Sequence, residues 1–446
     1  MAKHRKNNDR SSPADHSADK GWMRLDNAAK IFPAARSRRW SNVFRVSVTL
    51  DREIDPALLQ SAVDRTVPRF PSVAVRLNSG LFWYYLETVR RPPRVLPESD
   101  FPHPCARMKN KELKSCALRI LYYKKRISAE FFHSVTDGTG ALVFVKTLAA
   151  EYLAQRDGID PGTGNGVLDR DEAPKQSELE DSFLRCDGEV TASRKEENAY
   201  QLKGHREPDG FLNVTTGVID PDELLAEAHK KGVSLTCYLA SVLAYVICAE
   251  QARQTPKLRR RKPVKILVPI NLRRFFGGET MRNFVLYVTP SIDARNGDYS
   301  FDEILNAFHH QLGFLLTEKN LRTRITANVK PERSIFIRLM PLLIKNIVMK
   351  GIYNAVGEVK DSIQISNLGR AELPAGMESA VERFDFILGA NATKHNSCAA
   401  VTYKNRLCIN FSRTSVENDL EREFFTFLVR QGIHVLVESN RRYERQ

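Results

Sequence analysis

Two runs of alternating apolar and polar residues in the first third of the chain lead directly into a longer helical pattern. The runs cover Cys116–Tyr123 and Ile127–Phe132 and are separated by a short basic turn. This alternation predicts two strands that each bury one face. From Ala141 to Leu153 apolar residues recur at helical spacing, which predicts a helix directly after a Gly-Thr-Gly sequence. His133 therefore ends a predicted strand, in a turn that feeds a helix.

Strand and helix patterns also precede this unit. Alternation predicts a strand at Val43–Leu50, and Asp55-Pro56 opens a predicted helix with proline at its favoured first position. Another strand is expected at Phe82–Leu86. The five prolines of Arg90–Pro104 predict a loop there. The first part of the chain thus predicts mixed strands and helices.

The second half of the chain repeats this mixture. Strands are expected at Val214–Ile219, Val264–Ile270, Ser362–Ser366, Ala380–Leu388, Cys398–Tyr403 and Leu407–Ser412. Helices are expected at 220–232, at Val233–Ala249, after the capping box of Ser300 and Glu303, and at Ile335–Tyr353 and Asn418–Gln431. The uncharged stretch Val233–Ala249 is shorter than a membrane span and opens on a serine N-cap, so it predicts a buried helix.

Composition shifts along the chain suggest how it divides. Residues 1–21 are polar and charged and predict a disordered basic tail. We expect one α/β lobe at 22–155 and a second at 211–446, joined by a charged connection at 156–210 that is rich in glycine and acidic residues. The N-terminus lacks the apolar core of a signal peptide, and no transmembrane segment is expected, so we predict a cytoplasmic protein.

The turn at His133 contains residues that suit proton transfer. A histidine titrates near neutrality and can remove a proton from a hydroxyl or an amine at cellular pH. Asp137 lies at the predicted start of a helix, where a carboxylate is favoured and can bond backbone amides or an arginine. Gly138 permits a positive φ or a close approach of substrate to the backbone. The alternative is a buried histidine that only caps its own strand.

The spacing His133-x-x-x-Asp137-Gly138 resembles the signature of the CoA-dependent acyltransferase superfamily. That group includes chloramphenicol acetyltransferase, nonribosomal peptide condensation domains, plant BAHD acyltransferases and microbial alcohol acyltransferases. The resemblance covers Leu25–Asn440. It implies an α/β fold, built as two chloramphenicol-acetyltransferase-like α+β sandwiches that face each other across a central tunnel, with His133 at its middle as the general base.

Two further residues have counterparts in the resemblance. Val268–Arg273 is similar to the superfamily's P-(V/I)-x-x-R element, whose arginine pairs with the motif aspartate. Arg273 would then bind Asp137 and make it structural, although Arg274 is a rival for that position. Asn283 falls in a stretch similar to the family's Gly-Asn-(Phe/Val), with Arg282 in place of the usual glycine.

A second stretch with a family counterpart lies near the C-terminus. Ile365–Gly369 resembles the S-N-(L/V)-G strand end that faces the histidine. Ser366 or Asn367 would donate a hydrogen bond to the tetrahedral oxyanion. The alternative is a polar β-turn that satisfies only its own backbone.

Charge and cysteine usage narrow the possible ligands. The formal charge of +15 fits nucleic acid, an anionic membrane surface or an anionic co-substrate. Much of this charge is concentrated in basic runs at 3–10, 36–39, 90–94 and 257–262. No nucleic-acid-binding motif is present, and CoA phosphates would use one of these runs, although solvated faces explain them as well. The seven cysteines have no metal-ligand spacing, so we expect no metal.

These features predict an acyltransferase that moves an acyl group from acyl-CoA to a small-molecule alcohol or amine without a covalent intermediate. Condensation domains usually carry a second histidine where this chain has Phe132, and we expect no adjoining carrier or adenylation domain. Both differences favour a stand-alone enzyme similar to microbial alcohol acetyltransferases, which we expect to be a monomer. The alternatives are an enzyme that takes its acyl group from the pantetheine arm of an acyl carrier protein, and a catalytically idle binding module.

Overall fold

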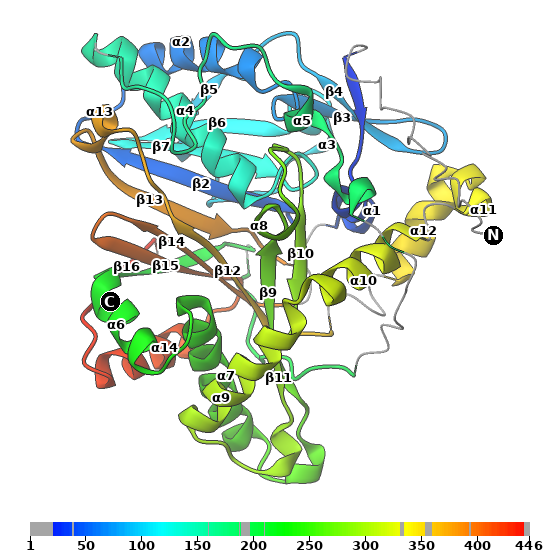
Figure 1. Ribbon diagram of the computed structural model, residues 1–446, viewed down its shortest axis with the longest axis vertical. Helices are drawn as coiled ribbons and strands as arrows, with labels where there is room; N and C mark the ends of the chain where they lie inside the picture. Colours follow the sequence, from blue (N-terminus) through cyan, green and yellow to red (C-terminus); the bar gives the residue numbers. More distant parts are fainter. Residues whose placement is uncertain are drawn as a thin grey trace, which may run out of the picture.

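The fold is described from a computed structural model of the whole chain. The structure describes residues 21–37, 40–158, 160–186, 188, 197–208, 210–330, 334–352, 359–391 and 394–440. Two large β-sheets lie one above the other, each with helices on its outer face (Figure 1). This is the predicted α/β architecture. The predicted disordered tail lies outside the described residues, apart from Gly21.

The first large sheet carries the predicted histidine turn. Its order is β13-β2-β7-β6-β5, with β2 at Val43–Leu50, β5 at Val95–Pro97, β6 at Leu118–Tyr123, β7 at Arg126–Phe132 and β13 at Val381–Leu388. Helices α2 (Pro56–Thr66) and α4 (Gly138–Asp157) cover its outer face (Figure 1). Asp55 caps α2 by accepting hydrogen bonds from two backbone amides, as its position before proline predicts.

The prediction that Arg90–Pro104 is only a loop was wrong. Strand β5 lies inside it and pairs in parallel with β6 at the sheet edge. The edge tolerates Pro97 because one side of an edge strand makes no ladder hydrogen bonds. The Val95 amide is instead satisfied from outside the sheet by Gln60 Oε1, at 2.8 Å.

The second large sheet has eight strands. It contains β8 (Asn213–Ile219), β9 (Val264–Asn271), β10 (Val285–Val288), β11 (Ser291–Ile292), β12 (Ile363–Arg370), β14 (Asn396–Tyr403), β15 (Arg406–Arg413) and β16 (Val435–Ser439). Its helices are α6 (Pro221–Lys230), α7 (Leu235–Gln254), α9 (Phe301–Leu315) and α14 (Asp419–Arg430). The predicted strands of this half are all present, and the sequence patterns missed β10, β11 and β16.

Helix α7 is the buried helix that the uncharged stretch predicts. It is the one helix among the described residues that is long and apolar enough to cross a membrane. Most of its apolar window is buried inside the fold, as in the core helix of a globular domain. Its N-cap Ser234 accepts a hydrogen bond from the Cys237 amide, as predicted.

One strand connects the two halves of the chain. Strand β13 comes late in the sequence but pairs with β2 in the first sheet, from Val381 opposite Leu50 to Leu388 opposite Phe44. The next strand along the chain, β14, returns to the second sheet. The division of the chain at 155 and 211 stays a prediction, and the expected connection falls partly outside the described residues.

A smaller sheet and a helical arm flank this body. The sheet has the order β1-β4-β3, with β1 at Trp22–Arg24, β3 at Val75–Ser79 and β4 at Tyr84–Thr88. The arm continues from α10 (Glu318–Val329) through α11 (Ile335–Leu339) to α12 (Leu342–Ile352) (Figure 1). The single helix predicted at 335–353 is broken because Pro341 lacks an amide donor and clashes with the preceding turn. Tyr353 lies outside the described residues.

The remaining helices are short. They are α1 (Ile31–Ala35), α3 (Asn110–Leu113), α5 (Gln176–Leu179), α8 (Arg273–Phe276) and α13 (Ala375–Glu378). Two of them, α1 and α8, present residues to the large cavity between the two halves. All seven cysteines are free thiols.

Candidate active site

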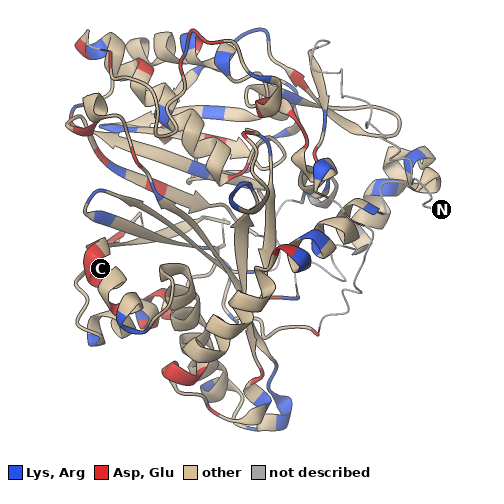
Figure 2. Ribbon diagram, viewed as in Figure 1, with Lys and Arg blue, Asp and Glu red and all other residues tan. Residues whose placement is uncertain are grey.

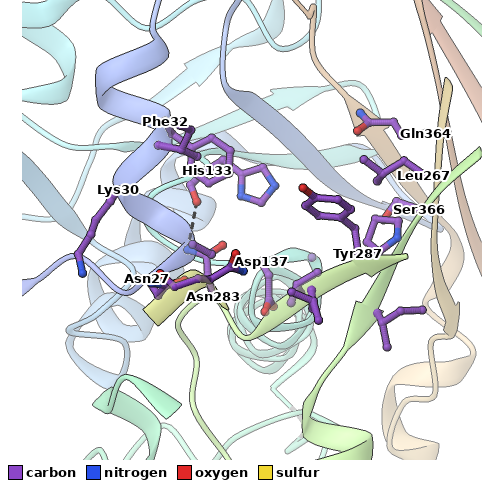
Figure 3. A pocket seen from close by; sticks show the side chains of 18 of the residues that line it. Asn27, Lys30, Phe32, His133, Asp137, Leu267, Asn283, Tyr287, Gln364 and Ser366 are labelled. Atoms are coloured by element: carbon purple, nitrogen blue, oxygen red, sulfur yellow. Dashed lines mark hydrogen bonds between the residues drawn. The ribbon is translucent and has the colours of Figure 1, made fainter. Parts of the chain in front are cut away.

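His133 follows the last residue of β7 and faces a cavity shared by both halves (Figure 3). Its amide donates to the Asn42 carbonyl at 2.8 Å, which fixes the turn against the neighbouring β2. The imidazole stacks on Phe32, with ring centroids 4.3 Å apart, and meets the edge of Phe44 at 5.0 Å. These two rings hold the imidazole plane. Neither aromatic residue was predicted, because no local pattern links them to the histidine.

The surroundings of His133 favour a neutral imidazole. Burial lowers its pKa below the usual 6.5, while its own backbone carbonyl, the Asp137 charge and the Asn283 amide oppose that shift. Its buried Nδ1 has no hydrogen-bond partner among the described residues. The ring points into the cavity (Figure 3), so a neutral nitrogen is available there to accept a proton.

The Asp137 carboxylate is fully occupied in holding the turn. One oxygen accepts from the amides of Thr139 and Gly140, both at 3.1 Å, which caps α4. The other accepts from the Phe284 amide at 2.9 Å and from Arg273 Nη1 at 2.8 Å. Four donors satisfy a carboxylate, so Asp137 positions the turn rather than transferring a proton.

Arg273 joins the two halves of the site. The structure brings it to Asp137, as the resemblance implies, and its other nitrogens donate to the carbonyls of Thr280 and Arg282. Its rival Arg274 is exposed and lines the cavity instead. The guanidinium thus ties α8, which follows β9, to the N-cap of α4, across the two sheets.

Asn283 supports the histidine from below. Its side-chain amide donates to the His133 carbonyl at 3.1 Å, a bond drawn in Figure 3, and to the Asp26 carboxylate at 3.3 Å. Burial raises the pKa of Asp26 to about 7, although nearby Arg282 lowers it. Asp26 was not predicted, because only the three-dimensional fold brings residue 26 beside residue 283.

Arg282, which replaces the glycine usual in the similar family stretch, is fully buried. Its guanidinium donates to the Leu179 carbonyl at 3.2 Å and to the Arg24 carbonyl. It also lies 3.9 Å from the Asp26 carboxylate. The side chain therefore links three separate segments beneath the histidine turn.

Ser366 and Asn367, the two side chains predicted to donate a hydrogen bond to the oxyanion, differ in their surroundings. The Asn367 amide donates to Thr236 Oγ1 at 3.2 Å, and its oxygen accepts from the Gly369 amide at 2.9 Å. Both ends of the Asn367 side-chain amide are thus engaged within the protein, and its role toward an oxyanion stays a prediction. Ser366 lines the cavity, and its hydroxyl has no partner among the described residues (Figure 3). Ser366 is therefore the donor that is available to a ligand.

Two glycines of the motif region stand where side chains do not fit. A methyl group at Gly138 would lie 2.5 Å from Leu368 Cδ2. At Gly140 it would lie 2.3 Å from Thr136 Oγ1 and 2.5 Å from the Met281 carbonyl oxygen. Both halves of the chain therefore pack directly against the start of α4.

The cavity has a volume of about 1830 Å³. Its lining comes from both sheets, from α1, and from the arm. Its cationic side chains are Arg24, Lys30, Arg274, Arg282, Arg338, Lys345, Lys360 and Lys394. The space is larger than the ordinary range for small-molecule sites and suits two substrates, one of them bulky. Within the described residues no group of three or more His, Cys, Asp or Glu side chains is placed to hold a metal.

No protein-family model matches the sequence, and no curated protein does. Solved structures do resemble it. Polyketide synthase associated protein 5 from Mycobacterium tuberculosis matches at TM-score 0.59 and 15% identity, over 91% of this chain and 96% of that one. F. sporotrichioides TRI101, solved with coenzyme A and T-2, matches at TM-score 0.57 and 13% identity, over 94% and 99%. The first condensation domain of the CDA synthetase matches at 0.56 and 15%, over 91% and 94%.

These matches extend over nearly the whole of each chain and show the fold. The chain has the two-lobed fold of condensation domains and acetyltransferases, as the resemblance of the His133 motif implies. Identities of this size do not transfer a substrate, so donor and acceptor are argued from the site itself.

Proposed function

We propose that this protein is an acyltransferase that moves an acyl group from acyl-CoA to an alcohol or amine, with His133 as the general base. The observation that carries the proposal is a buried imidazole aimed into a cavity that both halves line, and burial lowers the pKa of this histidine. The turn that presents it is locked by Asp137 and Arg273. The shared fold with TRI101, solved with coenzyme A, supports CoA as the donor.

The reaction needs one group that accepts a proton and one that donates a hydrogen bond to the oxyanion. Nε2 of His133 takes the proton of the acceptor hydroxyl or amine while the acceptor oxygen or nitrogen attacks the thioester carbonyl carbon. A tetrahedral oxyanion forms, and Ser366 Oγ is the side-chain donor we assign to it. The oxyanion then collapses, the carbon–sulfur bond breaks, and His133 returns the proton to the departing thiol. No covalent acyl-enzyme is required.

Burial in the cavity contributes to the rate. Holding donor and acceptor together converts an encounter of two molecules into a reaction within one complex. The exposed cations of the cavity lining, such as Arg24 and Arg274, are complementary to the pyrophosphate of CoA. Metal ions play no part in the proposed steps, and a cytoplasmic monomer remains our expectation.

A carrier-protein donor is the second candidate. It is motivated by the fold shared with the CDA synthetase condensation domain and by the net charge of +15, which suits an acidic partner. A catalytically idle binding module is the third, and the complete set of His133, Asp137 and Gly138 argues against it.

A panel of donors and acceptors distinguishes the three. Thiol release from acetyl-CoA and from longer acyl-CoAs is followed with alcohols and amines, beside the same acyl groups on an acyl carrier protein. Turnover with free acyl-CoA supports the proposal. Turnover only with the carrier-bound thioester supports the second candidate. No turnover with any donor, in a folded protein, would refute acyl transfer.

A further inference from the structure

The outer face of the arm formed by α11 and α12 is unusually apolar. We call residues 334–352 the apolar arm. Eight large apolar side chains on it are exposed, and six of them lie outside the cavity lining, namely Ile335, Phe336, Leu339, Leu343, Ile344 and Ile347. Phe336 is 83% exposed and Leu343 79%. They recur at helical spacing and form one stripe on each helix, so they gather on continuous faces. A contiguous patch of this kind marks a binding surface.

The apolar arm is attached to a second exposed apolar segment. The Leu342 amide donates to the Leu81 carbonyl in the turn between β3 and β4, at 2.9 Å. Lys345 Nζ donates to the Phe82 carbonyl at 2.9 Å and lies 3.5 Å above the Trp83 ring. Leu81 is itself 71% exposed. The patch thus extends from the apolar arm onto the β3–β4 turn.

The apolar arm also forms part of the wall of the catalytic cavity. Ile337, Met340 and Val348 line that cavity, while Phe336, Leu343 and Ile347 do not and face outward. The same two helices therefore separate the His133 cavity from the exposed apolar patch. Whatever covers the patch lies next to the cavity.

The charge of the apolar arm indicates which kind of surface covers the exposed apolar patch. The sequence of the apolar arm contains Arg338, Lys345 and Lys350 and no aspartate or glutamate, and Figure 2 shows basic but not acidic ribbon along it. The whole chain carries +15. Exposed apolar side chains on a segment with basic but no acidic residues are complementary to an anionic bilayer, where the apolar groups enter the acyl region and the exposed Arg338 meets headgroups. A second copy would bring like charges together.

We propose that the apolar arm docks this protein onto an anionic membrane surface, and that the acceptor is a membrane lipid with a hydroxyl or amine. The second part rests on the proposed acyl transfer, because the lipid passes from the bilayer, beside the apolar arm, into the cavity that holds His133. Acyl-CoA has a soluble, anionic head and needs no such route. Docking itself does not depend on catalysis.

Flotation with vesicles tests the docking. The full chain is mixed with vesicles of phosphatidylcholine and phosphatidylglycerol at seven to three, or of phosphatidylcholine alone. We expect the wild type to float with the anionic vesicles. The triple variant Phe336→Ser, Leu343→Ser, Ile347→Ser should partition at least about tenfold less. These side chains are exposed, so the variant should fold normally. The matched control, Leu436→Ser with Val437→Ser, changes exposed residues of β16 across the molecule and should float like wild type (Figure 1).

Several results would overturn the proposal. The wild type could remain at the bottom of the gradient, the triple variant could float as well as the wild type, or the wild type could bind both vesicle types equally. If the wild type binds no vesicles but forms a dimer in solution, and the triple variant is a monomer, the patch serves self-association instead.

Activity measurements distinguish membrane docking from the proposed acyl transfer. His133→Ala should float as wild type does. The triple variant should lose turnover with a bilayer-embedded alcohol and keep turnover with a soluble short-chain alcohol. If the wild type floats but transfers no acyl group to any acceptor, the proposed function fails and the docking stands. If it acylates only soluble acceptors, the lipid assignment is wrong.

Discussion

Replacing Arg273 by alanine removes the contact that joins the two halves of the site. The guanidinium is the sole side-chain donor among the described residues that meets the Asp137 carboxylate, which is 1% exposed. In the variant, the carboxylate keeps the three amide donors of Thr139, Gly140 and Phe284. It loses its only charged partner in the described structure.

The magnitude follows from that geometry. Removing one member of a buried ion pair costs about 3–5 kcal/mol. The remaining amide donors keep the cost near the lower end, while the freed carbonyls of Thr280 and Arg282 add about 1 kcal/mol at most where water reaches them. We therefore expect Arg273→Ala to lower the free energy of unfolding by about 3–4 kcal/mol. Activity should fall with it, because the histidine turn loses its anchor.

Urea unfolding followed by circular dichroism measures this change. The matched control is Arg274→Ala, since Arg274 is the neighbouring exposed arginine and should change stability by less than about 0.5 kcal/mol. A double-mutant cycle with Asp137→Asn should give a coupling energy of at least about 1 kcal/mol. An Arg273→Ala protein as stable as the Arg274→Ala control would refute the anchoring role.

Three further predictions concern the same site. Because burial lowers the pKa of His133, kcat/KM should be constant above pH 6.5 and fall only at lower pH, where the base becomes protonated; an acidic limb centred above 6.5 would contradict this. Gly140→Ala forces a methyl group against a backbone carbonyl and should cost about 1–3 kcal/mol in urea unfolding, whereas Gly313→Ala in α9 meets open space and should not destabilise. Arg282→Gly leaves buried Asp26 without its nearby cation and should lower the free energy of unfolding by about 3 kcal/mol, with a loss under 1 kcal/mol counting against the linking role.

The histidine turn could be predicted because its determinants are local. A strand end, a helix N-cap aspartate and a glycine follow one another between residues 132 and 138, and each has its own sequence signal. The pairing of Asp137 with Arg273 followed from resemblance, since their distance in the chain leaves no local pattern. The structure shows the contact at 2.8 Å, while the catalytic roles stay predictions.

Other features depended on contacts that sequence patterns do not record. Asp26 and Phe32 reach the site only when the N-terminal segment folds against Asn283 and His133. Strand β16 was missed because four of its five residues are exposed, so no apolar alternation exists there. The break at Pro341 did have a sequence signal, and the apolar residues on both sides of it masked that signal.

The central claim is that His133 is the general base. Its most direct test compares thiol release by wild type and His133→Ala with the best pair of acyl-CoA and acceptor. Circular dichroism checks that both proteins are folded. We predict that the variant keeps its fold and loses turnover by about 10²–10⁴-fold. A folded His133→Ala protein that retains wild-type turnover would contradict the account.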